Sequence, residues 1–244
     1  MRRWITRPLA ALLAAAVCAV LLYAQPLAAT PRARDAMRSG PDVTVVDRPT
    51  EIELRPARTP VRATGLVFHP GAGVDSRAYL PLLRPVAEAG YVVVVLKAPF
   101  GMAILQPQQG RHLFTRAGPP RRWVAAGHSL GGPTAARLAT HHPDEVRGLL
   151  LWASYPDISL RDRRDLTVTS IYGTHDALSR TPDVLGAPLP PNTEFVPVPG
   201  AVHAHFGDYG PQRGDGRPGT TREQAQQQII ATTLRHLDQV DTAP

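Results

Sequence analysis

The sequence Gly127-His128-Ser129-Leu130-Gly131 constrains the fold of this chain more than any other feature. An apolar run over residues 122–126 precedes it, and helix-forming residues over 133–139 follow it. This is the G-x-S-x-G pattern of a strand that turns sharply into a helix, with a serine at the turn. The glycines let strand and helix approach closely, and the strained turn exposes the serine side chain. The pattern therefore predicts a nucleophilic serine, Ser129, on a sheet whose strands alternate with helices.

Apolar runs of strand length recur along the chain and alternate with helical patterns. The strand-like runs cover residues 43–46, 51–54, 65–68, 91–96, 122–126, 148–152, 166–172 and 194–198, and the helical patterns cover 76–89, 102–109, 133–139 and 221–240. The β-branched run at 91–96 is typical of a central parallel strand covered on both faces. Repeated strand–helix–strand units predict an α/β domain with a doubly wound, mostly parallel sheet flanked by helices. Only a brief stretch separates the strands on either side of residue 160, so we expect no large lid domain.

The first 29 residues predict a targeting segment. Arg2, Arg3 and Arg7 precede an apolar run over 9–22, which has the length of a signal-peptide core and is short for a membrane span. Residues 27–29 only approximate a cleavage site, so a cleaved signal peptide and an uncleaved anchor both stay open.

The charge before the run keeps the amino terminus inside and sends the rest of the chain across the membrane. We therefore expect an exported protein, either secreted or held at the outer face of the membrane by the uncleaved segment, its one membrane contact. After it we expect a linker over 30–42 and the folded domain over 43–244.

Composition excludes several other classes. The chain has 244 residues, 43% of them hydrophobic, which is enough for one substantial core. Its formal charge of +7 rests on scattered arginines without interleaved aromatics, so we expect no nucleic-acid partner. The one cysteine, Cys18, lies in the apolar run, which leaves no disulfide or cysteine nucleophile for the domain. We expect a monomer with no cofactor and no metal.

A serine hydroxyl becomes a strong nucleophile only when a base takes its proton, and an acid orients that base. In chains with this elbow the acid comes second along the sequence and the histidine third. The strand at 166–172 ends in Gly173-Thr174-His175-Asp176. Asp176 therefore lies just past the carboxyl end of a late strand, where the acid is needed, and Asp183 is the reserve.

The base is expected on the loop after the last strand. His203 follows Gly200 by three residues, the usual placement of the catalytic histidine, and we prefer it to His205. His128 and His175 are assigned structural roles, because each is only the neighbour of a better-placed residue.

Two main-chain amides are needed to stabilise the anion that forms during attack. The first is that of Leu130, the residue after the nucleophile. The second is expected from the glycine-rich loop at 69–74, where a main-chain N–H can face the site without side-chain obstruction. We choose Ala72 there, with Gly73 as the alternative.

Together these motifs resemble the dienelactone hydrolase, chlorophyllase and cutinase-like branch of the α/β-hydrolases. The matching residues are His69-Pro70-Gly71-Ala72-Gly73 with Tyr79, Gly127-His128-Ser129-Leu130-Gly131-Gly132, Tyr172-Gly173-Thr174-His175-Asp176, and Gly200 to His203. The resemblance covers about residues 60–240 and implies a carboxylic ester hydrolase with a Ser129–His203–Asp176 triad and no metal. Dienelactone hydrolases carry cysteine where this chain has Ser129, which indicates a more general esterase.

The sequence thus predicts cleavage of small or polymeric esters through an acyl-enzyme. The same residues would serve an acyltransferase equally well, and a non-catalytic binding protein on the same scaffold is a further alternative. The loop at 206–216 is expected to support His203, since its acidic residues lack the spacing of a calcium loop. Phe100 and Tyr155 are candidates for the substrate pocket.

Overall fold

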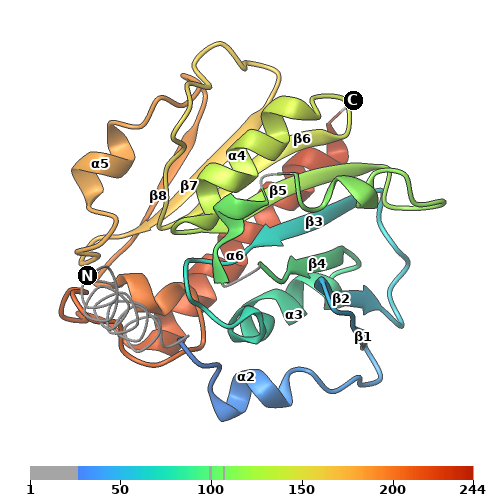
Figure 1. Cartoon of the computed structure of the whole chain (residues 1–244), viewed down its shortest axis with the longest axis horizontal. Helices are drawn as coiled ribbons and strands as arrows, with labels where there is room; N and C mark the ends of the chain where they lie inside the picture. The colour runs from blue at the N-terminus through green and yellow to red at the C-terminus, as the bar shows by residue number, and fades with distance from the viewer. Residues whose placement is uncertain (1–26, 99–100, 107, 244) are drawn as a thin grey trace, which may run out of the picture.

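An eight-stranded sheet runs through the molecule, with helices on both of its faces (Figure 1). The computed structural model describes residues 27–98, 101–106 and 108–243. Its strands are β1 (Val43–Asp47), β2 (Glu51–Pro56), β3 (Thr64–His69), β4 (Val92–Leu96), β5 (Arg122–His128), β6 (Val146–Trp152), β7 (Thr167–Gly173) and β8 (Glu194–Val198). Its α-helices are α2 (Pro31–Asp35), α3 (Leu80–Glu88), α4 (Gly131–His141), α5 (Thr181–Leu185) and α6 (Arg222–Thr242). Single 3-10 turns are η1 (Ser76–Tyr79), η3 (Ala103–Leu105), η4 (Arg111–Leu113) and η5 (His203–Phe206).

The sheet is parallel except at one side. Its strand order is β1-β2-β4-β3-β5-β6-β7-β8. The pairs β1–β2 and β2–β4 are antiparallel, and every pair from β4 to β8 is parallel. The carboxyl ends of the parallel strands therefore share one edge, which lies to the left in Figure 1, where the arrow of β3 points. Sites of open α/β sheets form at this carboxyl edge. The predicted doubly wound, mostly parallel sheet is confirmed.

Each face of the sheet has its own apolar core. Helix α4 covers one face, and α3 and α6 lie together on the other (Figure 1). Along β4 the side chains alternate between the two cores, with Val93 and Val95 in one and Val92 and Val94 in the other. All of these side chains are buried, as predicted for a central strand. None of the helices in the described ranges has the length and apolar character needed to cross a bilayer.

Two segments differ from their sequence expectation. The sequence predicts a helix over 102–109. In the described residues of this range, 102–106 and 108–109, the structure has only the single turn η3, because Gln106 precedes a proline and takes φ −136° and ψ 68°. Residues 30–42, expected as a linker, begin with α2, in which Ala33 is fully buried. This segment packs on the domain.

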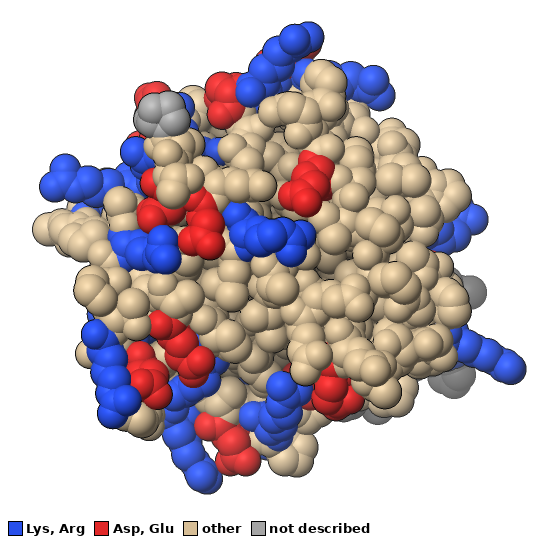
Figure 2. Space-filling model, turned by 180° about the vertical axis from the view of Figure 1, so that it is seen from behind, with Lys and Arg blue, Asp and Glu red and all other residues tan. Residues whose placement is uncertain are grey.

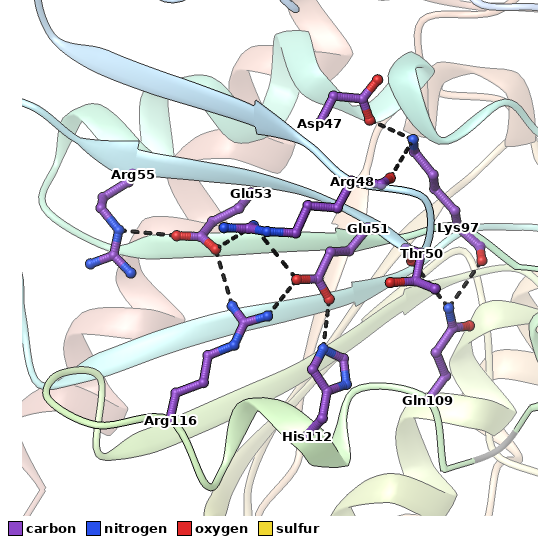
Figure 3. A network of polar contacts seen from close by, with 10 residues as sticks. All are labelled: Asp47, Arg48, Thr50, Glu51, Glu53, Arg55, Lys97, Gln109, His112 and Arg116. Carbon is purple, nitrogen blue, oxygen red and sulfur yellow. Dashed lines mark hydrogen bonds and ion pairs between the residues drawn. The ribbon is translucent and has the colours of Figure 1, made fainter.

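Two buried glutamates of β2 hold the connection between β4 and β5 against the sheet (Figure 3). The side chains of Glu51 and Glu53 are only 1% and 4% exposed. The guanidinium of Arg116 donates to both carboxylates, Arg48 donates to Glu53 at 2.8 Å, and Nε2 of His112 lies 2.7 Å from Glu51. A buried carboxylate without cations around it is strongly destabilising, so these contacts fix η4 and the residues after it.

Lys97 ties the end of β4 to the β1–β2 turn (Figure 3). Its ammonium group donates to the carboxylate of Asp47 and to the carbonyl of Arg48, the latter at 2.7 Å. Its main-chain N–H donates to the carbonyl of Thr50 at 2.8 Å. The only lysine of the chain is thus bound through both its main chain and its side chain.

Candidate active site

Ser129 lies between the end of β5 and the start of α4. Its φ is +52°, a left-handed conformation that a serine keeps only where its surroundings hold it. The N–H of Ser129 donates to the carbonyl of Trp152 at 3.1 Å, and the hydroxyl of Ser154 donates to the carbonyl of Ser129 at 2.6 Å. The end of β6 therefore holds the strained turn.

The glycines of the elbow allow backbone-to-backbone contact. A Cβ on Gly131 would lie 2.1 Å from the carbonyl oxygen of His69, and a Cβ on Gly127 would lie 2.3 Å from the carbonyl of Gly131. Neither distance is possible for a side chain. Strand β5, helix α4 and the loop after β3 thus meet without side chains between them.

His203 and Asp176 are joined by a buried hydrogen bond at the carboxyl edge. Nδ1 of His203 lies 2.8 Å from Oδ2 of Asp176, and both side chains are buried. Oδ1 of Asp176 accepts from the N–H groups of Leu178 and Ser179 at 2.8 and 2.7 Å. Because both carboxylate oxygens are engaged, the acid has a fixed orientation, and it favours the His203 tautomer that carries its proton on Nδ1.

The other ring nitrogen of His203, Nε2, makes no hydrogen bond to Ser129 in this structure. Nε2 is buried and has no hydrogen-bond partner within the part of the chain that the structure describes. The ring centre of His203 lies 4.5 Å from that of His128, the residue before Ser129. The structure thus brings His203 next to the residue before Ser129, and proton removal from the Ser129 hydroxyl would need Nε2 to come within hydrogen-bond distance of it.

The two reserve residues belong to other contacts. Asp183 forms an ion pair with Arg180 at 3.0 Å. His205 is buried, and burial together with the charge of Arg222 lowers its pKa. Asp183 therefore does not pair with His203, and His205 does not pair with Asp176.

In the loop after β3, the main-chain amides of Gly71 and Gly73 are hydrogen-bonded and, within the described ranges, that of Ala72 is not. The N–H of Gly71 donates to the hydroxyl of Tyr79 at 2.8 Å, and the N–H of Gly73 donates to the carbonyl of Gly101 at 2.8 Å. No oxygen among the described residues accepts from the N–H of Ala72. Ala72 is therefore better placed than the alternative, Gly73, to donate to a bound anion.

The main-chain N–H of Leu130 likewise has no acceptor among the described residues. Leu130 is the N-cap of α4, and the first N–H groups of a helix have no acceptor inside it. The dipole of α4 adds positive potential at this point. Because Gly131 packs directly on His69 and Pro70, the loops that carry Leu130 and Ala72 are in contact.

Behind the elbow, Tyr79 and His128 link the two loops, which sequence analysis did not anticipate. The hydroxyl of Tyr79 accepts from Gly71, so its own proton goes to Nδ1 of His128, 2.9 Å away. Both side chains are fully buried. Burial and the neighbouring His203 lower the pKa of His128 far below its ordinary value, so the ring stays neutral and carries its proton on Nε2. His128 is structural, as its place in the sequence indicated.

The loop at 206–216 braces His203 from the other side. The two carboxylate oxygens of Asp215 accept the N–H groups of His203 and Ala204 at 3.0 and 2.8 Å. The hydroxyl of Tyr209 points to the carbonyl of His203 and donates to Gln212 at 3.0 Å. These contacts agree with the predicted supporting role of the loop.

The start of the described chain joins the same loops. The N–H of Leu27 donates to the carbonyl of Gly73 at 2.6 Å, and its carbonyl accepts from Asp75 at 3.1 Å. The hydroxyl and N–H of Thr30 both donate to Asp208, each at 3.0 Å. Residues 27–29 fall in the targeting segment predicted from sequence. Leu27 pairs with the loop that carries Ala72, and Ala29 pairs with Tyr209.

Within the described ranges, no group of three His, Cys, Asp or Glu side chains could hold a metal ion. Of the two pocket candidates, Tyr155 is 39% exposed, and Phe100 lies outside the described residues.

A parallel sheet with this strand order, a serine elbow after β5 and an acid–histidine pair after β7 and β8 define an α/β-hydrolase fold. The chain belongs to the alpha/beta hydrolase family, whose family model matches residues 65–228. Membership of this family supports a hydrolase-type function. No curated protein sequence matches the chain.

One similar solved structure is the alpha/beta hydrolase domain-containing protein 10 from mouse. It is 11% identical, covers 81% of this chain and 99% of its own, and superposes with a TM-score of 0.55. At this identity the likeness concerns the fold alone.

Proposed function

We propose that this protein is a serine hydrolase that cleaves carboxylic esters with Ser129, His203 and Asp176. The observation that carries the proposal is the buried hydrogen bond between His203 and Asp176 beside the strained serine elbow. Two further features support it: a base nitrogen without a partner among the described residues, and two main-chain amides available at loops in contact.

In the acylation step, Nε2 of His203 takes the proton of Ser129 as the serine oxygen attacks the ester carbonyl. Asp176 stabilises the imidazolium that forms and keeps its ring orientation. The carbonyl oxygen becomes an oxyanion, to which the amides of Leu130 and Ala72 donate. When the intermediate collapses, His203 gives its proton to the leaving alcohol, and the acyl group remains on Ser129.

Water then takes the place of the alcohol. His203 removes a proton from water, the hydroxide attacks the acyl-enzyme, and the acid leaves as Ser129 recovers its proton. An acyltransferase would differ only in the acceptor of this second step. We also propose that the protein is exported, as its amino-terminal sequence indicates.

The test is hydrolysis of p-nitrophenyl esters from acetyl to palmitoyl by the full chain. We expect turnover that falls by several orders of magnitude in Ser129→Ala and stays unchanged in the exposed control Ser39→Ala. Addition of a simple alcohol separates hydrolysis from acyl transfer, because a transferase forms the new ester as its main product. Absence of turnover in folded wild-type protein would contradict the esterase and favour a binding role.

A further inference from the structure

Exposed apolar side chains of this protein gather at the edge that carries the elbow. The exposed large apolar residues in the described ranges are Val46, Met102, Leu105, Leu130, Tyr155, Leu178 and Leu185. All of them except Val46 lie in connections that leave the carboxyl ends of β4, β5, β6 and β7. These connections leave the same edge of the sheet as the one that carries Ser129.

The amino-terminal segment enters the fold at the same edge. Leu27 pairs with Gly73 and Val74, next to the proposed oxyanion donor Ala72. The apolar run of the sequence ends at Leu22, five residues earlier. Five residues span at most roughly 18 Å. If the run is inserted in a membrane, Leu27, which pairs with the neighbour of Ala72, is therefore held within about that distance of the point where the chain leaves the apolar phase.

The distribution of charge agrees with this orientation. In Figure 2, seen from behind, charged side chains gather over the left, upper and lower parts of the face, and fewer, mostly basic ones lie at its right margin. Because this view is turned about the vertical axis, its right side corresponds to the carboxyl edge at the left of Figure 1. The charged side chains near the exposed Leu178 and Leu185 include Arg180, so this edge offers both apolar residues and a cation to the headgroup and acyl boundary of a bilayer.

We propose that the carboxyl edge of the sheet docks on a lipid bilayer, with residues 9–22 retained as the anchor, and that the enzyme takes esters presented at that surface. The second half of this inference rests on the proposed esterase function, and the first half does not. Leu105 and Leu178 would enter the interface, and Tyr155 has the amphipathic ring that favours it. We call the exposed apolar residues after β4, β5, β6 and β7 the apolar rim. A hydrophobic polymer would also fit this rim, but it would give no role to the anchor at the same edge.

The single cysteine allows a direct test on the full chain. In a Cys18→Ser background, single cysteines at Leu105, Leu178 and the control Gln239 carry an environment-sensitive fluorophore. Gln239 is exposed near the carboxyl end of α6, where Ala243 contacts Arg122 at the start of β5 and hence at the opposite edge. The chain is reconstituted in vesicles of equal parts phosphatidylcholine and phosphatidylglycerol that contain nitroxide-labelled lipid.

We expect a blue shift and at least severalfold stronger quenching at positions 105 and 178 than at 239. Equal quenching at all positions, or failure of the chain to float with the vesicles, overturns the docking. A blue shift at 105 and 178 on a polyester film without quenching on vesicles overturns it in favour of a polymer surface.

Activity separates this inference from the proposed function. Met102→Gln and Leu105→Gln should lower the rate of hydrolysis of a glyceride ester embedded in the vesicles severalfold. Their rate on dissolved p-nitrophenyl acetate should stay within about twofold of wild type, because only the embedded ester requires apolar contact with the membrane. The matched control Val46→Gln, on the edge strand β1, should change neither rate. Equal rates for the variants and wild type on the embedded ester overturn the role of the rim. If wild type hydrolyses neither ester, the esterase proposal fails, and the fluorescence measurement still decides the docking.

Discussion

The carboxylate of Asp215 binds the main chain of His203, with its Oδ1 3.0 Å from the histidine N–H. Oδ2 of the same group accepts from Ala204 at 2.8 Å. The proposed base is therefore held through its side chain by Asp176 and through its main chain by Asp215. A small displacement of the main chain would therefore change the position of Nε2.

Asp215→Ala should lower kcat for p-nitrophenyl acetate by about 10- to 100-fold, which corresponds to the loss of charge-assisted hydrogen bonds worth about 1.5–3 kcal/mol. KM should change little, because the residue does not touch the substrate. Steady-state kinetics with the exposed control Asp165→Asn check the result. Unchanged kcat would mean that the loop only covers the site.

Asp176→Asn should lower kcat by about 10⁴, because an amide can no longer select the His203 tautomer with a free Nε2. Its geometry and the two hydrogen bonds from Leu178 and Ser179 should persist, so thermal stability should change little. Asp183→Asn is the matched control and should keep full activity. A comparable loss in both variants would transfer the role of the acid away from Asp176.

Tyr79→Phe should destabilise the protein by about 2–4 kcal/mol, because it leaves the N–H of Gly71 and Nδ1 of His128 buried without partners. The melting temperature should fall by several degrees. Tyr155→Phe, at an exposed position, should leave it within error. Calorimetry of the two variants decides whether the buried connection behind the elbow matters for stability.

Arg116→Ala should lower the free energy of unfolding by about 2 kcal/mol at pH 7, since it removes a cation that donates to both Glu51 and Glu53. Burial raises the pKa of Glu53, but the hydrogen bonds and charges of Arg55 and Arg48 outweigh it and lower that pKa below 4.5. Stability from this carboxylate is thus present above pH 4.5 and is lost as the pH falls through the lowered value.

Urea unfolding at pH 7 and below pH 4 measures this difference. The gap between wild type and Arg116→Ala should narrow in acid, whereas the exposed control Arg121→Ala should follow wild type at both values. A gap that is constant with pH would show that packing of the arginine, and not its charge, stabilises the loop.

Local patterns were sufficient to predict the sheet, the elbow and the pairing of His203 with Asp176. Each rests on a strand end followed by a fixed short spacing, and hydrogen bonding within a loop preserves that spacing. The choice of Ala72 over Gly73 was different. The contact that favours Ala72 comes from the carbonyl of Gly101, which is distant in sequence and accepts from the N–H of Gly73.

The burial of Glu51 and Glu53 was not predicted from sequence. Glutamate alternates with Ile52 and Leu54, a pattern typical of a strand with one solvated face. The connection after β4 covers that face and supplies Arg116. No periodicity shows which distant loop covers a strand. The pairing of Leu27 with Gly73 was also not predicted. The small and apolar residues at 27–29 fit a signal-peptide cleavage site as well as they fit a segment paired with a distant loop.

Lys97 makes this chain a natural reporter of local opening. A protease that cuts only after lysine has a single target bond in the sequence, between Lys97 and Ala98. That bond leaves β4 where the lysine is bound to Asp47, Arg48 and Thr50. The protease can reach this bond only after the contacts of Lys97 have broken. The rate at which one band becomes two on a gel would therefore measure how often this corner of the native protein opens.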